Sequence, residues 1–373
     1  MTFKIYWAGG FDLGKRTIIL AAGGTGGHVF PAQALAETLL SRGWRVFLVT
    51  DERGNLFLDE FPKNVQKLVL DMTNPRGGGK FRLIYSWWLL IRSLIIILKF
   101  CIKVKANVIV GFGGYPSATS MVAAYILRIP SAIHEQNAVL GRVNRIFKNR
   151  VNLLVFGINP ELMQDSKTTV RVFGNPIRQS VMKDSPTEYS LLPSKSFVIL
   201  VVGGSQGANF VSSIACNAII SLPEKLRRKL IVLHQCREEH IVEIKTKYKA
   251  SKIKYQIKNF FSDISLNLNR ANLIIGRSGA SSLAELCVFG RPSILIPLPS
   301  AVGNHQALNA AVMERGGASI VLSQNVVNSD ELSNKISYIM GNFEVANNMA
   351  LSAQKLSKPN AASDFALELE TLV

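Results

Sequence analysis

The amino-acid sequence predicts an α/β protein built from two doubly wound sheets. The chain has 373 residues, which is more than one hydrophobic core usually covers, so two domains are expected. Short β-branched apolar runs alternate with longer helical patterns, and this alternation is typical of parallel sheets covered by helices. Apolar residues make up 48% of the chain and charged residues 18%, which is enough apolar material for a substantial core.

The first strand is expected at residues 17–22, an apolar run that enters a glycine-rich loop. Residues 1–16 are expected to form an N-terminal extension that is poorly ordered over residues 1–14. This extension lacks the long apolar run that follows the basic start of a secretory signal peptide. We therefore do not interpret it as a signal peptide.

Most of the further strands are continuous apolar runs rather than alternating ones, as expected for strands that are covered on both faces. They are expected at residues 45–50, 107–111, 131–134, 153–156, 197–202, 230–234, 273–275 and 293–297. Helices are expected at residues 31–42, 118–127, 208–222 and 281–289. A Gly-Asn-Pro turn at residues 174–176 is expected to separate an N-terminal domain (17–176) from a C-terminal domain (177–357).

The most apolar run of the chain, residues 81–102, lies in a strongly basic region. The formal net charge is +18, residues 72–134 contain no acidic residue, and the run includes Trp87 and Trp88. A membrane span needs about 20 apolar residues with few charges, and Arg92 interrupts this run. A helix with one face in the core and the other on an anionic lipid surface is favoured over a purely buried helix. Nucleic acid fits less well, because polar base-reading side chains are lacking.

Three glycine-rich loops, at residues 23–27, 111–114 and 203–207, each follow an apolar strand and precede a helical pattern. In such loops, backbone N–H groups can approach a phosphate closely at the positive end of a helix. None completes a dinucleotide-binding fingerprint or a P-loop, and no suitably placed acidic residue is clear after the first strand. One such loop alone indicates only a tight turn, whereas three favour a ligand cleft between two sheets.

Polar residues follow other strands. The tetrad at residues 134–137 is an unusual choice for a core and suits a cleft. Residues 277–285 follow a strand and open a helix, where the carboxylate of Glu285 could accept two hydrogen bonds from a ribose diol. The alternative for Glu285 is a residue that stabilises the helix dipole. Residues 304–309 suit the same cleft or an ordinary helix start.

The four cysteines have no metal-binding or disulfide-framework spacing, which fits a reducing cytosol.

The chain contains, in order, the segments AGGTGGHVFPA, GFGGYPS, HEQNAVLGRVNR, FGNPIR, GGSQGA, RSGASSLAEL, GRPSILIPLP and NHQALNA. Over about residues 17–373 these segments resemble the MurG family of peptidoglycan N-acetylglucosaminyltransferases, which belongs to glycosyltransferase family 28. The resemblance implies two Rossmann-like domains facing a cleft, the GT-B architecture. It places the lipid-linked acceptor on the N-terminal domain and the UDP-sugar on the C-terminal domain, with residues 358–373 returning to the first domain.

The implied reaction is inverting transfer of N-acetylglucosamine (GlcNAc) from UDP-GlcNAc to the C4 hydroxyl of the N-acetylmuramic acid (MurNAc) of lipid I, forming lipid II without a cofactor. Implied partners are UDP-GlcNAc, lipid I, an anionic membrane surface and other cell-wall synthesis proteins, with no nucleic acid. The implied location is the cytoplasmic face of the cell membrane, as a peripheral protein. Two alternatives remain: a sugar-nucleotide-binding protein without transferase activity, and an NAD-linked Rossmann enzyme.

The resemblance also implies the site residues. Residues linked to activity are His28, Tyr115, Glu135 and Asn309, and those implied to bind the donor are Thr25, Gly26, Gly27, Asn137, Arg178, Ser205, Gln206, Phe261, Ala280, Ser281, Ser282, Leu283, Ala284, Glu285 and Gln306. The contact at Phe261 is expected through its backbone to uracil. Two positions depart from the family pattern: Gly303 stands where an Asp is usual, and Ser282 where a Thr is usual.

The implied reaction requires a base for the acceptor hydroxyl and charge stabilisation for the departing UDP. His28 is the first candidate for the base, because an imidazole titrates near neutral pH, and a purely positioning role for it stays equally open. Glu135 is the second candidate. The chain has no Asp-x-Asp sequence, so no metal clamp is expected. Instead, Ser205, Arg178 and the helix after the third loop are expected to stabilise the pyrophosphate.

Overall fold

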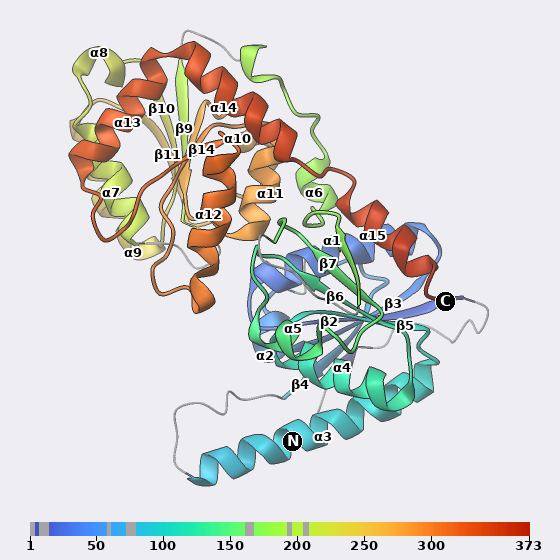
Figure 1. Cartoon of the computed structure of the whole chain (residues 1–373). Coiled ribbons are helices and arrows are strands. Elements are labelled where there is room, and N and C mark those ends of the chain that lie inside the picture. Colours follow the sequence, from blue (N-terminus) through green and yellow to red (C-terminus); the bar gives the residue numbers. More distant parts are fainter. Residues whose placement is uncertain are drawn as a thin grey trace. The chain divides into compact units, whose positions relative to one another are not determined.

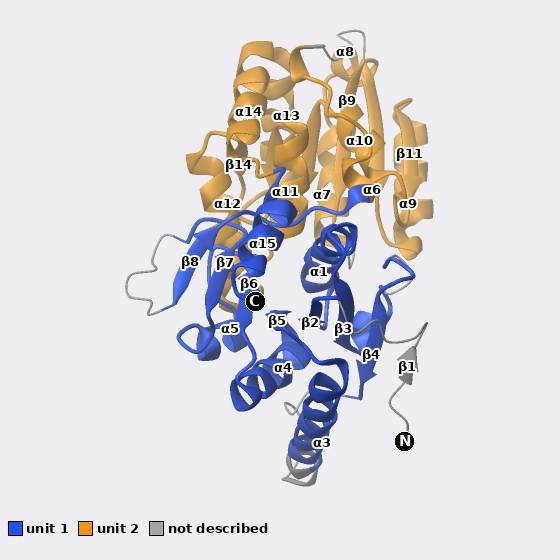
Figure 2. Ribbon diagram, turned by 90° about the vertical axis from the view of Figure 1, so that its right-hand side faces the viewer, with its two compact units in different colours: residues 1–179, 359–373 blue, residues 180–358 orange. Residues whose placement is uncertain are grey.

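The computed structural model describes residues 4–6, 15–57, 61–71, 80–160, 168–191, 196–203 and 209–373. The chain divides into two compact units (Figure 2). Unit 1 contains Met1–Gln179 and Pro359–Val373, and unit 2 contains Ser180–Lys358. These limits lie close to the domain boundaries expected from the sequence.

Unit 1 is built on one sheet with the strand order β1-β4-β3-β2-β5-β6-β7-β8. All neighbouring strands are parallel except β1, which is antiparallel to β4. The strands are β1 (Lys4–Tyr6), β2 (Thr17–Ala22), β3 (Arg45–Asp51), β4 (Gln66–Leu70), β5 (Val108–Gly113), β6 (Ser131–Glu135), β7 (Leu153–Phe156) and β8 (Thr169–Val172). The expected N-terminal extension therefore contains a strand, which the prediction of poor order did not include.

Helices cover both faces of this sheet, because alternate side chains of each central strand point to opposite faces. Ile18 and Leu20 of β2 belong to one apolar cluster, which is shared with α1 (Gly26–Ser41) and α15 (Ala361–Glu370). Ile19 of β2 belongs to a second cluster, on the side of α3 (Lys80–Val104), α4 (Gly114–Leu127) and α5 (Arg142–Phe147). Figure 1 shows α3 beneath α4, with the short α2 (Glu52–Asn55) following β3.

Helix α3 confirms the prediction of a helix over the apolar run and has two apolar faces. Its buried face, at helical spacing, consists of Ser86, Leu89, Ser93, Ile97, Phe100, Cys101 and Val104. The other face exposes large apolar side chains, namely Tyr85, Trp87, Trp88, Ile91, Ile95 and Ile102, with Trp87 and Trp88 59% and 52% exposed. Among the described helices, none is both long enough and apolar enough to cross a bilayer.

Unit 2 is built on a fully parallel sheet with the order β11-β10-β9-β12-β13-β14. The strands are β9 (Phe197–Val202), β10 (Leu230–Gln235), β11 (Lys254–Lys258), β12 (Leu273–Gly276), β13 (Ser293–Leu295) and β14 (Ser319–Val321). The helices are α6 (Gln179–Met182, which begins at the unit limit), α7 (Asn209–Ile220), α8 (Glu224–Arg227), α9 (Glu238–Ala250), α10 (Ile264–Arg270), α11 (Ala280–Phe289), α12 (His305–Arg315), α13 (Ser329–Gly341) and α14 (Phe343–Leu356). Its main apolar cluster joins the sheet to α7, α9, α13 and α14.

Two buried histidines make stability depend on acid pH. Burial lowers the pKa of His134 to about 4 and that of His234 to about 3, whereas an exposed histidine has a pKa near about 6.5. Below about pH 6.5 the unfolded chain therefore binds protons that the folded chain does not bind. The free energy of unfolding should decrease as the pH is lowered from there to about 4. We expect the free energy of unfolding, measured in urea, to decrease over this interval.

The variant His134→Asn should weaken this pH dependence, because it removes one of the groups that titrate only after unfolding. His240→Asn is the matched control, since His240 lies on the surface helix α9. An unfolding free energy for His134→Asn with the wild-type pH slope would contradict the assignment.

Candidate active site

The candidate site in unit 1 lies where the sheet reverses its strand order. From β2 the chain continues to β3 and β4 on one side, and then returns to β5 on the other side of β2. Ligands of doubly wound sheets bind outside the carboxyl ends of the strands at such a switch point. The first glycine loop follows β2. Of the second predicted loop, residues 111–113 form the end of β5 and Gly114 begins α4, so this segment meets the first loop at the switch point.

The two loops pack so closely that side chains on Gly23 and Gly114 would not fit. A Cβ atom on Gly23 would lie 2.6 Å from Cδ of Pro116, and one on Gly114 would lie 2.9 Å from the carbonyl oxygen of Gly23. The Gly23 N–H also donates to the carbonyl of Gly113 at 3.3 Å. Because Gly113 has a φ of +113°, a region that L side chains rarely adopt, glycine is required there as well.

His28 stands beside this loop contact, in the first turn of α1. Its Nδ1 lies 2.7 Å from the carbonyl oxygen of Gly23. A carbonyl oxygen only accepts hydrogen bonds, so Nδ1 carries the proton and the neutral ring keeps its lone pair on Nε2. The Nε2 atom faces Gly113, where a Cβ atom would lie only 2.8 Å away. Among the sequence-predicted residues, Thr25 occupies the N-cap position of α1, Gly26 and Gly27 begin the helix, and Tyr115 lies in the first turn of α4.

Asp51, at the carboxyl end of β3, is a residue that the sequence analysis missed. Its side chain is buried, and its Oδ1 accepts hydrogen bonds from the N–H groups of Gly24 at 3.0 Å and Gly54 at 2.9 Å. Its Oδ2 lies 3.1 Å from the guanidinium of Arg53. An acidic residue ending the second strand of the fold is the signal that could have identified it. Here Asp51 holds the glycine loop itself.

Glu135 is fixed by its neighbours. Its Oε1 accepts from the backbone N–H of Asn137 at 3.1 Å and from the Asn137 side chain at 3.0 Å. Its Oε2 accepts from Gly141 N–H at 2.7 Å and from Asn144 Nδ2 at 2.8 Å. The carboxylate is buried, so this geometry suits fixing the loop that carries Asn137 better than moving a proton.

The tetrad at residues 134–137 does not form a cleft as the sequence suggested. His134 is fully buried between Phe112 and Phe365, at ring distances of 5.5 and 5.6 Å, and its Nε2 lies 3.1 Å from the carbonyl of Gly174. Gln136 is also buried and donates to the carbonyl of Phe112 at 3.1 Å. Hydrogen bonds satisfy both polar side chains within the core, and only Asn137 of the tetrad is half-buried.

Arg178, expected at the donor pyrophosphate, is buried near the end of unit 1. Its guanidinium carbon lies 4.0 Å from the ring centroid of Phe30 on α1. This contact holds the cation by an attraction to the aromatic face, which is stronger where water is excluded.

The candidate site of unit 2 lies at the corresponding switch point, between β9 and β12. A pocket at the carboxyl ends of the strands is lined by residues that include Val202, Gly276 and Arg277, together with Ser282 and Glu285 of α11. Burial lowers the pKa of Arg277. The structure thus brings predicted donor residues of α11 to one pocket, lined in full by Val202, Ile264, Leu268, Ile274, Gly276, Arg277, Ser282, Leu283, Glu285, Leu286 and Leu295.

Gln306 and Asn309 of α12 are joined to the loop before α11. Asn309 is fully buried and donates to the carbonyl of Ser278 at 3.1 Å, while the Ser278 hydroxyl donates to the carbonyl of Gln306 at 2.7 Å. The side-chain oxygen of Gln306 accepts from Leu298 N–H at 3.0 Å. Asn309 therefore holds the loop before α11 in place from a buried position.

The remaining predicted residues are distributed as follows. Ala280, Ser281 and Ala284 lie on α11, the ring of Phe261 is buried, and Ser205 and Gln206 lie outside the described residues. Gly303 has a φ of +66°, and no atom lies within 4 Å of a Cβ placed there. A side chain at position 303 would therefore contact no other described atom here, although it would have to adopt a φ that favours glycine.

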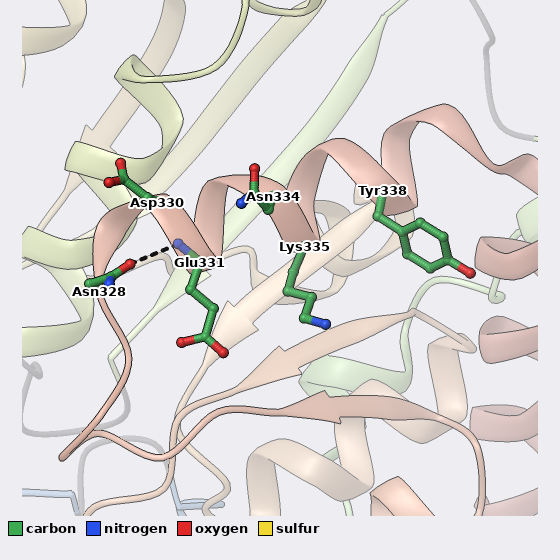
Figure 3. A pocket seen from close by; sticks show the side chains of 6 residues that line it. All are labelled: Asn328, Asp330, Glu331, Asn334, Lys335 and Tyr338. Atoms are coloured by element: carbon green, nitrogen blue, oxygen red, sulfur yellow. Dashed lines mark hydrogen bonds between the residues drawn. The ribbon is translucent and has the colours of Figure 1, made fainter.

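A second hollow, in Figure 3, lies along the first turns of α13, where the Asn328 side chain accepts from Glu331 N–H at 2.8 Å. Its lining includes none of the sequence-predicted residues: it consists of Asn328, Asp330, Glu331, Asn334, Lys335 and Tyr338. We therefore do not treat it as part of the site.

The two Rossmann-like units form the two-domain GT-B fold, and the family models that match them give the class of the protein as a glycosyltransferase. The model of the glycosyltransferase family 28 N-terminal domain matches residues 18–154, and that of the family 28 C-terminal domain matches residues 198–365. The chain belongs to glycosyltransferase family 28 and, within it, to the MurG family.

The similar proteins span nearly the whole chain. A protein of Caulobacter vibrioides is 39% identical over 354 residues, 94% of this chain and 98% of its own length. A protein of Mesorhizobium japonicum is 36% identical over 94% of this chain and 93% of its own length. Both are named UDP-N-acetylglucosamine–N-acetylmuramyl-(pentapeptide) pyrophosphoryl-undecaprenol N-acetylglucosamine transferase. The crystal structure of Acinetobacter baumannii MurG has a TM-score of 0.79 at 27% identity, covering 96% of this chain and 99% of that one.

Proposed function

We propose that this enzyme transfers GlcNAc from UDP-GlcNAc to the C4 hydroxyl of MurNAc in undecaprenyl-pyrophosphoryl-MurNAc-pentapeptide, forming lipid II for peptidoglycan synthesis. The observation that carries this proposal is the 39% identity, over 94% of the chain, to a transferase named for this reaction. The two glycine loops that meet in unit 1 and the α11 pocket in unit 2 offer groups suited to a sugar acceptor and a sugar nucleotide.

In the proposed step, the C4 hydroxyl attacks C1 of GlcNAc as the bond from C1 to the UDP oxygen breaks, and α configuration becomes β. The hydroxyl proton passes to Nε2 of His28, which keeps a lone pair because Nδ1–H is bound to Gly23. UDP leaves with the bonding electron pair, and Arg178 with the third glycine loop, including Ser205, stabilises its charge. Glu135 holds Asn137 in place, and Glu285 with Ser282 binds the donor.

The direct test is incubation of the protein with labelled UDP-GlcNAc and a lipid I analogue. We expect UDP release together with a β-1,4-linked disaccharide on the lipid. UDP binding without product would indicate a sugar-nucleotide-binding protein, and NAD binding without response to UDP-sugars would indicate a dehydrogenase. Either result would contradict the proposal.

We further propose that the protein works as a peripheral protein at the cytoplasmic face of the membrane and docks through the exposed face of α3. That face combines the exposed Trp87, Trp88, Ile91 and Ile95 with a sequence that has no acidic residue between 72 and 134. Amphipathic surfaces of this kind bind anionic lipid by burying apolar side chains in the bilayer. Electrostatic attraction adds about 1 kcal/mol for each basic residue near the membrane surface.

Wild-type protein is expected to bind anionic vesicles reversibly at low salt, and salt should weaken the binding by screening. Replacing Trp87, Trp88 and Lys80 with alanine should reduce vesicle co-sedimentation, while the affinity for UDP-GlcNAc stays unchanged. Val242→Ala, which removes an exposed apolar side chain from α9 of unit 2, is the control. If the wild-type protein does not bind anionic vesicles at low salt, the exposed face of α3 is not a membrane-docking surface. If carbonate cannot extract the protein from membranes, the protein spans the bilayer.

A further inference from the structure

A single peptide group connects Asp51 with His28. The N–H of the Gly23–Gly24 peptide donates to Oδ1 of Asp51 at 3.0 Å, and the carbonyl of the same peptide accepts from Nδ1–H of His28 at 2.7 Å. We propose that Asp51 is a positioning residue of the transfer reaction: through this peptide it holds the proton of His28 on Nδ1 and strengthens Nε2 as a proton acceptor.

The physical basis is polarisation of the peptide. A carboxylate that accepts from an amide N–H forms a charge-assisted hydrogen bond, and hydrogen bonds in a chain strengthen one another where water is excluded. Asp51 is only 1% exposed, so its charge is weakly screened. The carbonyl of Gly23 therefore gains negative character, which stabilises the His28 ring when it has taken up the hydroxyl proton. No proton leaves Asp51 or the peptide in this arrangement.

Other charged side chains near the two loops also influence the protonation of His28. Arg53 of α2 contacts the other oxygen of Asp51 at 3.1 Å, but its side chain is 59% exposed, so water weakens its opposing effect. Two further titratable side chains among the described residues are Tyr115, in the first turn of α4, and Arg178, which lies over Phe30 of α1.

Asp51→Asn is the informative substitution, because an amide oxygen can still accept from Gly24 and Gly54 while the negative charge is lost. Glu52→Gln is the matched control: it removes the same charge at the next position, where Glu52 is exposed and accepts a hydrogen bond from the Asn55 side chain. The first readout is NMR of the protein with isotope-labelled histidine. We expect the wild type and Glu52→Gln to hold the proton of neutral His28 on Nδ1, and the His28 titration to move to lower pH only in Asp51→Asn.

The second readout is kinetic, and it rests on the proposed function of His28. Partners that orient metal-binding histidines contribute about 10- to 100-fold, and we expect Asp51→Asn to lower kcat about tenfold, with an unchanged KM for UDP-GlcNAc. In the His28→Gln background the same substitution should cause no further loss, because residues that act as one unit are not additive. An equal loss in both backgrounds would overturn the proposal, as would a neutral His28 with its proton on Nε2.

The two readouts separate this proposal from the proposed function. If His28→Gln transfers sugar at the wild-type rate, His28 is not the base, whereas the NMR comparison still decides whether Asp51 controls the imidazole. If Asp51→Asn does not fold, the wild-type protein still decides the tautomer by NMR: a proton of neutral His28 on Nδ1 supports the proposal, and one on Nε2 overturns it.

Discussion

Replacing His28 with alanine is expected to lower kcat for sugar transfer by about 10²- to 10⁴-fold, the usual contribution of a general base. The affinity for UDP-GlcNAc should stay nearly unchanged, because the predicted ribose contact, Glu285, lies in the α11 pocket of unit 2. The physical reason is the bond from Nδ1–H to Gly23, which leaves the lone pair of the neutral ring on Nε2. The measurements are single-turnover transfer to a lipid I analogue and UDP-GlcNAc binding by calorimetry.

His240→Ala provides the matched control, because it removes a histidine from the surface of α9 in unit 2. The control should retain wild-type kcat. A loss of less than about tenfold in His28→Ala would assign the base to another group, either Glu135 or water. The Glu135 carboxylate would then have to release hydrogen bonds from Asn137, Gly141 and Asn144 before it could accept a proton.

The central strands of both units were predictable, because their apolar runs are covered on both faces. The helices α1, α3, α4, α7 and α11 were also predicted, whereas the sequence analysis did not identify the long helices α9, α13 and α14. The strands that the sequence analysis did not identify all lie toward the edges of the two sheets, namely β1, β4, β8, β11 and β14. In β11 the exposed Lys254, Gln256 and Lys258 alternate with half-buried side chains, β8 is largely exposed, and β14 has only three residues. Such segments carry little apolar pattern, and their pairing depends on a neighbouring strand that is distant in sequence.

The glycine-rich loops were also predictable. Where two backbone segments pack closely, glycine is needed whichever residues surround them. What the sequence could not reveal is which polar side chains the fold would use to hold those loops. Asp51 binds Gly24, a residue 27 positions earlier, and His134 is buried against Phe365 of the C-terminal helix. In both cases tertiary contacts decide whether a polar residue faces a ligand or the core, and local pattern carries no information about them.

Glu285 is expected to hold the ribose of the donor. It lies on α11 in the pocket beside Ser282, at the carboxyl ends of β9 and β12. A carboxylate there can accept hydrogen bonds from both hydroxyls of a ribose diol, and charged hydrogen bonds of this kind contribute about 1.5–3 kcal/mol. The alternative is that Glu285 only stabilises α11, in which case its removal would change the stability of unit 2 and leave donor binding intact.

Glu285→Ala should therefore weaken the binding of UDP-GlcNAc by about 10- to 150-fold, since each 1.4 kcal/mol corresponds to a factor of ten. Binding of the acceptor should be unaffected, because the acceptor is assigned to unit 1. Calorimetric titration with UDP-GlcNAc, and separately with UDP and with GlcNAc 1-phosphate, distinguishes a ribose contact from a sugar contact: the loss should persist with UDP and vanish with GlcNAc 1-phosphate. Glu344→Ala, which removes an exposed carboxylate from the first turn of α14, controls for the change of charge in unit 2. Unchanged donor affinity in Glu285→Ala, together with a lowered melting temperature, would assign Glu285 to the stability of α11 instead.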